Sequence, residues 1–135
     1  MSHKFTVLNG GKNKARTKGK GFEPEAEERL DLNRYLVKHP ASTFYVRVSG
    51  DSMTGAGINP NDILVVDRFI KHKSGNIVIA SINGELCVKR LRIKDGSAWL
   101  DSENPAYDPF EVSPVDEFEV WGVVTAIIRV LNVEE

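Results

Sequence analysis

The chain has 135 residues, of which 41% are hydrophobic and 27% are charged, a size and composition typical of one globular domain. This balance excludes a disordered, collagen-like or coiled-coil protein, and no run approaches the roughly 18 consecutive apolar residues of a membrane-spanning helix. The single cysteine, Cys87, excludes an internal disulfide. Because the N-terminal stretch also lacks an apolar signal-peptide core, we expect a cytoplasmic protein that does not engage a membrane.

The formal net charge of −1 is unevenly distributed along the chain. Residues 1–22 contain six lysines and arginines and no acid, whereas the remainder has an excess of acids. From Gly10 to Gly21 no hydrophobic side chain is larger than alanine, so this stretch cannot offset the entropy lost on ordering. We therefore expect a flexible N-terminal arm over residues 1–30 and a folded domain over 31–135. A basic arm can contact nucleic acid, although a short solvated tail is the favoured interpretation of this charge.

A short helix is predicted directly after the arm. Asp31 can cap it, Leu32, Tyr35 and Leu36 follow at helical spacing, and Pro40 ends it. Beyond this point the hydrophobic pattern changes to the period of two that is typical of β-strands.

The predicted strands cover residues 44–48, 63–66, 76–82, 85–93, 98–100 and 120–131. Asn83-Gly84 is the dipeptide best suited to a type I′ hairpin turn, and Asp95-Gly96-Ser97 indicates a second tight turn. Gly122 predicts a bend in the last strand. The fold class is therefore mostly β and antiparallel, with one short helix and a flexible N-terminal arm.

A candidate catalytic pair follows from one serine and one lysine. Ser52 lies in the turn sequence Ser49-Gly50-Asp51-Ser52-Met53, directly after a predicted strand. Strand alternation places Lys89 on the same face as Cys87, Leu91 and Ile93, which directs it at the core. Burial disfavours a charged amine, and a neutral amine near Ser52 can act as the general base of a Ser-Lys dyad.

Backbone N–H groups of Asp51 and Ser52 are the predicted oxyanion hole for this dyad. The alternative stays open that Ser52 is an ordinary turn residue and that Lys89 extends along an edge strand to reach water. The three histidines and Cys87 have no metal-ligand spacing, and no phosphate-binding glycine loop is present, so no metal and no cofactor are expected.

Several ordered segments resemble the LexA-like, S24 self-cleaving peptidases, and within them the UmuD-like branch. The similarity runs from about Leu30 to Leu131. It includes SGDSM at 49–53, DILVVD at 62–67, GNIVIA at 75–80, VKRL at 88–91, NPAY at 104–107 and GVV at 122–124.

The resemblance implies a LexA-like peptidase β fold with Ser52 as nucleophile and Lys89 as general base. It further implies an SOS-response factor that cleaves its own N-terminal arm when stimulated by the RecA filament on single-stranded DNA. The implied partners are a second copy of the chain, in a homodimer, and a UmuC-like Y-family polymerase subunit for error-prone translesion synthesis.

The arm departs from the family pattern at the candidate scissile bond, Lys20–Gly21. Members of the family have a small residue before this glycine, and here a long cation stands there. The segment that follows is also about four residues shorter, which removes roughly 14 Å of reach, although cleavage in trans within a dimer restores it. A non-cleaving accessory or regulatory dimer with a vestigial dyad is therefore the alternative function.

Two related functions are not expected. About 30 polar residues before the β domain are too few to form the helix-turn-helix domain of a repressor, so sequence-specific DNA binding is not predicted. A signal peptidase shares the Ser-Lys chemistry but requires a membrane anchor.

Overall fold

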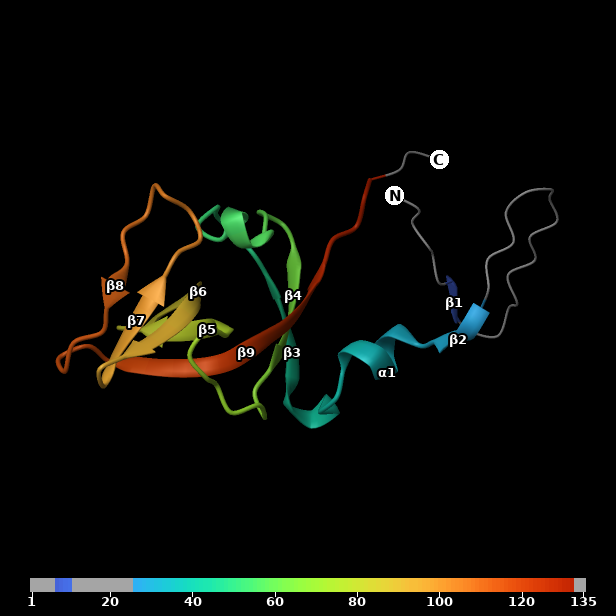
Figure 1. Cartoon of the computed structure of the whole chain (residues 1–135), viewed down its shortest axis with the longest axis horizontal. Helices are drawn as coiled ribbons and strands as arrows, with labels where there is room; N and C mark the ends of the chain where they lie inside the picture. The colour runs from blue at the N-terminus through green and yellow to red at the C-terminus, as the bar shows by residue number, and fades with distance from the viewer. Residues whose placement is uncertain (1–6, 11–25, 133–135) are drawn as a thin grey trace. The chain divides into compact units, whose positions relative to one another are not determined.

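The computed structural model describes residues 7–10 and 26–132, which divide into two compact units, one up to Lys38 and one from His39 onwards (Figure 1). In the first unit, β1 (Val7–Gly10) pairs in parallel with β2 (Ala26–Leu30). Most of the predicted flexible arm, residues 1–6 and 11–25, lies outside the described residues.

The predicted short helix is confirmed as α1 (Leu32–Leu36). The Asp31 carboxylate accepts hydrogen bonds from the backbone N–H groups of Asn33 and Arg34, at 3.0 and 3.3 Å. These bonds satisfy two of the donors that a helix leaves free in its first turn. The apolar residues that predicted the helix do not form a core, since Leu32 and Tyr35 are both 60% exposed.

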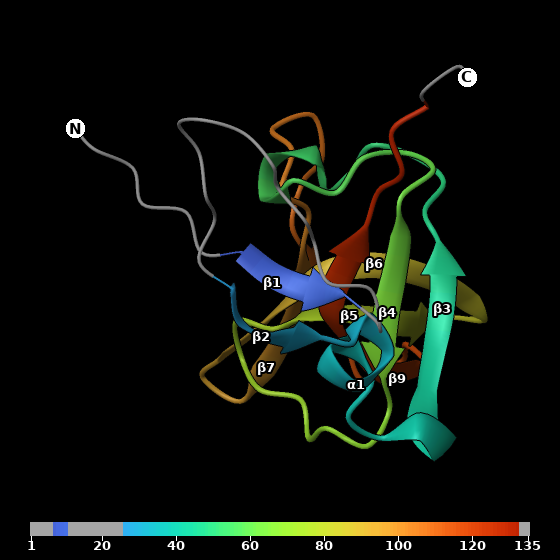
Figure 2. The same ribbon diagram turned by 90° about the vertical axis from the view of Figure 1, so that its right-hand side faces the viewer.

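The second unit is built on one seven-stranded antiparallel sheet in the order β3-β4-β9-β5-β6-β7-β8, which confirms the mostly β prediction. β3 forms one edge of the sheet beside β4 (Figure 2). The strands are β3 (Thr43–Arg47), β4 (Ile63–Asp67), β5 (Ile77–Ile82), β6 (Glu85–Lys94), β7 (Ser97–Asp101), β8 (Phe110–Glu111) and β9 (Phe118–Ile128). Two 3-10 turns, η1 (Pro40–Ser42) and η2 (Thr54–Ala56), flank β3.

Both predicted hairpin turns are present. Asn83 and Gly84 have φ values of +50° and +86° and join β5 to β6, as a type I′ turn requires. Asp95 and Gly96, at +50° and +75°, join β6 to β7. These turns fix the register of three consecutive strands.

Two apolar clusters form the core, and alternation along β5 contributes to both. Ile79 packs in the first and Val78 and Ala80 in the second. The first cluster comprises Val48, Met53, Ile58, Leu64, Val66 and Ile79, and the second comprises Val78, Ala80, Leu91, Leu100 and Val123. In β6, Val88 packs against the first cluster and Cys87 against the second, so the predicted alternation of this strand is confirmed.

The last strand is shorter than predicted, because β9 ends at Ile128 and not at Leu131. Arg129 leaves the strand pattern to donate to both carboxylate oxygens of Asp62, each at 2.7 Å, and to the carbonyl of Gly57. The Asp62 side chain is buried, and the hydrogen bond from Arg129 lowers its pKa to about 2. The pairing of β9 with β4 thus ends at Ile128 and Ile63, and the Arg129–Asp62 ion pair lies directly beyond it.

Candidate active site

Ser52 lies in the turn that follows β3. Gly50 has a φ of +99°, which a residue with a side chain rarely adopts, and it turns the chain out of the strand direction. On either side the core holds the turn, because Val48 and Met53 are both buried in the first cluster. Ser52 itself stays partly exposed between these two anchors.

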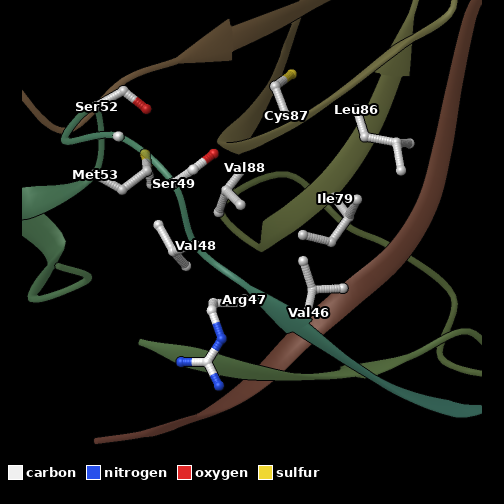
Figure 3. Close-up of a pocket in the computed structure, with 11 residues that line it drawn as sticks. Val46, Arg47, Val48, Ser49, Ser52, Met53, Ile79, Leu86, Cys87 and Val88 are labelled. Carbon is white, nitrogen blue, oxygen red and sulfur yellow. The ribbon is translucent and has the colours of Figure 1, made fainter. Parts of the chain in front are cut away.

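A groove of about 190 Å³ opens beside Ser52. Figure 3 shows the residues after β3 on one side and those of β6 across from them. Six apolar side chains contribute to its lining, namely Val46, Val48, Met53, Ile79, Leu86 and Val88, and Arg47, Ser49, Ser52 and Cys87 add polar groups. The groove is suited to a short segment of polypeptide with an apolar side chain.

The backbone N–H groups of Asp51 and Ser52 are the predicted oxyanion donors. Within the described chain, the backbone N–H groups of Asp51 and Ser52 donate to no other residue, whereas the Asp51 carbonyl accepts from Thr54 at 3.3 Å. Unpaired N–H groups beside a serine can stabilise the negative charge that develops on an attacked carbonyl. Their role as an oxyanion hole stays a prediction.

Lys89 lies on β6, opposite Val78 of β5, and is half-buried. Its Nζ donates to Ser102 Oγ at 2.6 Å and lies 5.2 Å from the ring centroid of Tyr107. Among the residues that the structure describes, no hydrogen bond joins Lys89 to Ser52. The predicted dyad is therefore not assembled by direct contact in this conformation.

One segment, Ser102–Tyr107, contacts both predicted catalytic residues or their immediate neighbours. Ser102 and Tyr107 contact Lys89, and Asn104 Nδ2 donates to the carbonyl of Asp51 at 2.9 Å. The Tyr107 hydroxyl donates to Asp51 Oδ1 at 2.6 Å, and this bond raises the pKa of Tyr107. The segment thus links the Ser52 turn to Lys89.

A close backbone contact fixes this segment against η2. The N–H of Gly55 donates to the carbonyl of Glu103 at 2.7 Å, and the Glu103 carboxylate pairs with Arg90 of β6. A Cβ at position 55 would lie only 2.5 Å from the Glu103 carbonyl oxygen. Glycine is therefore required for the observed approach of the two segments.

Comparison with known proteins identifies the family. A family model described as Peptidase S24-like matches residues 8–125. SamA of Salmonella typhimurium is 47% identical over 103 residues, which cover 76% of this chain and 71% of SamA. ImpA of Escherichia coli is 44% identical over 112 residues, covering 77% and 70%, and MucA of Escherichia coli is 39% identical over 106 residues, covering 78% and 70%.

The chain is a UmuD-like member of the S24 peptidase family. S24 proteins form a family of serine peptidases, and the role of Ser52 as the nucleophile stays a prediction. No helix within residues 7–10 and 26–132 has the length and apolar character needed to span a membrane.

The sequence prediction missed two residues of the candidate site, Ser102 and Gly55. Ser102 and Gly55 were assigned no role, although Ser102 directly follows β7, whose Asp101 pairs with Arg90. Continuing that register places Ser102 across from Lys89, so the strand pairing contained the signal. The candidate scissile bond, Lys20–Gly21, lies outside the described residues.

Cys87 lies in the groove lining with Ser52. Burial raises the pKa of its thiol, which disfavours the reactive thiolate. Burial therefore disfavours Cys87 as a nucleophile in this groove.

Proposed function

We propose that this S24 protein is a self-cleaving serine peptidase in which Ser52 attacks a peptide bond of the N-terminal arm and Lys89 acts as general base. The observation that carries the proposal is the position of Ser52 beside an apolar groove, on a turn whose backbone N–H groups at Asp51 and Ser52 have no acceptor among the described residues. A tethered arm reaches such a groove at high effective concentration, so no high-affinity site for an outside substrate is needed.

The reaction begins when the Ser52 hydroxyl proton passes to the Lys89 amine while Oγ bonds to the carbonyl carbon. The N–H groups of Asp51 and Ser52 then stabilise the oxyanion. As the C–N bond breaks, Lys89 returns the proton to the leaving nitrogen. Water hydrolyses the resulting ester, with Lys89 taking a proton from the water and Ser52 regaining its own.

Proton transfer requires Lys89 Nζ to reach hydrogen-bond distance of Ser52 Oγ. That contact is not formed in the described structure, and catalytic hydrogen bonds often tighten only when substrate binds. We therefore propose that the bound arm completes the site, and that the RecA filament on single-stranded DNA stimulates cleavage by favouring the bound arm.

The proposed biological role is that of an SOS-response accessory factor. In this role the chain forms a homodimer, and the trimmed dimer binds a UmuC-like polymerase subunit for translesion synthesis. The UmuD-like family membership supports this role.

A non-cleaving accessory dimer is the second candidate. It is favoured by the absence, among the described residues, of a hydrogen bond between Lys89 and Ser52, and by Lys20 at the candidate bond. A long cation fits poorly in a groove lined mainly by apolar side chains.

Mass spectrometry of the purified full chain, incubated at pH 7 to about 10, tests the first proposal against the second. More of the lysine amines are neutral at the higher pH, so we expect cleavage to accelerate and residues 1–20 to be released. Ser52→Ala should abolish the fragment. Ser49→Ala removes a second hydroxyl from the same groove and serves as the matched control that should still be cleaved.

A chain that stays intact at every pH, with and without RecA filament, contradicts self-cleavage. If that intact chain binds the polymerase subunit, the accessory function is supported instead. Cleavage at an equal rate in Ser52→Ala excludes Ser52 as the nucleophile.

A further inference from the structure

We propose that Ser102 is a positioning residue for the proposed reaction, because its hydroxyl holds the Lys89 amine in the orientation that the general base requires. The inference rests on the proposed function and extends it to a residue outside the predicted dyad. It concerns how the base is held, and it adds no step to the chemistry.

The strand register brings Ser102 to Lys89. β6 and β7 pair antiparallel, with Arg90 opposite Asp101. Lys89, which precedes Arg90, therefore faces Ser102, which follows Asp101 directly after the end of β7. Side chains at such positions have Cβ atoms about 5 Å apart. The 2.6 Å bond from Lys89 Nζ to Ser102 Oγ spans that gap.

A lysine side chain needs such a partner to act at a fixed position. Its four-carbon chain has many rotamers, and the amine makes no other hydrogen bond to a described residue. The second contact of the amine, with the face of the Tyr107 ring, is attractive but weakly directional. Ser102 therefore supplies the directional contact that fixes Nζ.

The chemistry of the amine makes this contact compatible with base catalysis. A neutral amine has two N–H donors and one lone pair, and the lone pair must face Ser52. Ser102 Oγ accepts from one N–H and leaves the lone pair free. The same oxygen can still accept from the ammonium that forms after proton transfer, so the contact persists through the reaction.

The surroundings of Ser102 support this assignment. Tyr107, in the same segment, contacts Lys89 through its ring and Asp51 through its hydroxyl, so the segment that holds the amine is also hydrogen-bonded to the residue before Ser52. Holding a base near its target to within a fraction of an ångström is a large contribution to catalysis. The segment can therefore set the distance between the two reacting groups.

The test compares self-cleavage of the full chain in four proteins from pH 7 to about 10.5. These are the wild type, Ser102→Ala, Ser102→Thr and Ser97→Ala, the last being the matched control on β7 with no hydrogen bond to Lys89. We expect Ser102→Ala to cut about 10 to 100 times more slowly, Ser102→Thr to recover most of the rate because it keeps the hydroxyl, and Ser97→Ala to behave as wild type.

The pH profile of the cleavage rate distinguishes positioning of the Lys89 amine from mere stabilisation of its charged form by Ser102. If Ser102 only stabilised the ammonium, its loss would leave the rate at high pH equal to or above that of the wild type. We expect a lower rate even at the alkaline end. Cys87 and Tyr107 also ionise at alkaline pH, and every variant retains both, so their titration affects all profiles alike.

A second readout does not depend on cleavage. Acetylation by acetic anhydride, followed residue by residue with mass spectrometry, measures the availability of each lysine amine. In Ser102→Ala, Lys89 should be acetylated faster, while exposed Lys94 on the same strand serves as an internal reference and should not change. Circular dichroism establishes that each variant is folded. Ser102→Cys keeps a side chain of similar shape but offers only a weak hydrogen-bond acceptor. Its cleavage and Lys89 acetylation rates should therefore resemble those of Ser102→Ala.

The outcomes distinguish this inference from the function on which it rests. If the wild type is cleaved and folded Ser102→Ala is cleaved at the same rate or faster, the positioning role is wrong and the proposed function stands. If the wild type is never cleaved, the proposed function fails and the positioning role fails with it. If Ser102→Thr does not recover the rate, the hydroxyl is not the group that matters.

Discussion

Replacement of Gly55 by alanine tests whether the Ser102–Tyr107 segment must lie close to the Ser52 turn. The new Cβ would lie 2.5 Å from the Glu103 carbonyl oxygen, and ordinary contacts begin near 3.4 Å. One of the two segments must therefore move by about 0.5 to 0.9 Å. Backbone strain does not contribute, since Gly55 lies in η2 and does not have a positive φ.

The displacement has a structural and a functional consequence. Overpacking of this kind costs about 1–3 kcal/mol, and the Gly55–Glu103 hydrogen bond, worth about 1 kcal/mol, is weakened or lost. Because about 1 kcal/mol lowers the Tm of a domain of this size by roughly 4–8 °C, we expect a Tm lower by at least about 4 °C. Misplacement by almost 1 Å should slow self-cleavage by about 10 to 100 times.

Thermal unfolding by circular dichroism and the mass-spectrometric cleavage assay measure the two effects. Thr54→Ala is the matched control, since Thr54 is exposed in the same turn and its loss should change the unfolding free energy by less than about 0.5 kcal/mol. An unchanged Tm together with an unchanged cleavage rate in Gly55→Ala would refute the inferred close packing. A lower Tm with an unchanged cleavage rate would show that the approach serves stability alone.

Three further predictions concern the scaffold. The folded-state pKa of Asp62 is about 2, below the ordinary 3.8, so its ion pair stabilises the fold above about pH 4 and this stabilisation is lost as the pH falls toward 2. Urea unfolding measured over this pH range should show that loss of stability in the wild type and not in Asp62→Asn. A loss of equal size in the variant would contradict the prediction. Leu64 is fully buried, so Leu64→Ala should lower the free energy of unfolding by about 2–5 kcal/mol, measured as a lower urea midpoint. A loss below about 1 kcal/mol would contradict its place in the core. Gly84→Ala should lower stability by about 1 kcal/mol because its φ of +86° is strained for alanine, and an unchanged Tm would count against the type I′ turn.

The local features of the fold were predictable from short stretches of sequence. Asn83-Gly84 predicts its turn because two consecutive residues must adopt positive φ, and few other dipeptides do so readily. Asp31 predicts the start of α1 for a similarly local reason, since its side chain bonds the next turn of backbone. The alternation of β6 follows from its pairing in a sheet with apolar groups on both faces.

Features that depend on distant residues were not predicted. The end of β9 was placed too late, because the apolar pattern continues through Val130 and Leu131 while the strand stops where Arg129 turns to Asp62, 67 positions earlier in the chain. The partner of Lys89 was missed for the same reason. The sequence indicated a lysine directed at apolar neighbours, and only the pairing of β6 with β7 identifies Ser102 as the group beside it.

Comparison of two variants then separates the two contributions of the Ser102–Tyr107 segment. Gly55→Ala displaces the backbone of the segment and so changes its contacts with Asp51 and with Lys89 together. Ser102→Ala removes one hydroxyl and leaves the contacts of Asp51 in place. If the amine needs only its hydrogen bond, Ser102→Ala should slow cleavage as much as Gly55→Ala does. If the distance between the turn and the strand also matters, Gly55→Ala should slow cleavage further, and the double variant should fall short of the product of the two effects, because both act on the same lysine.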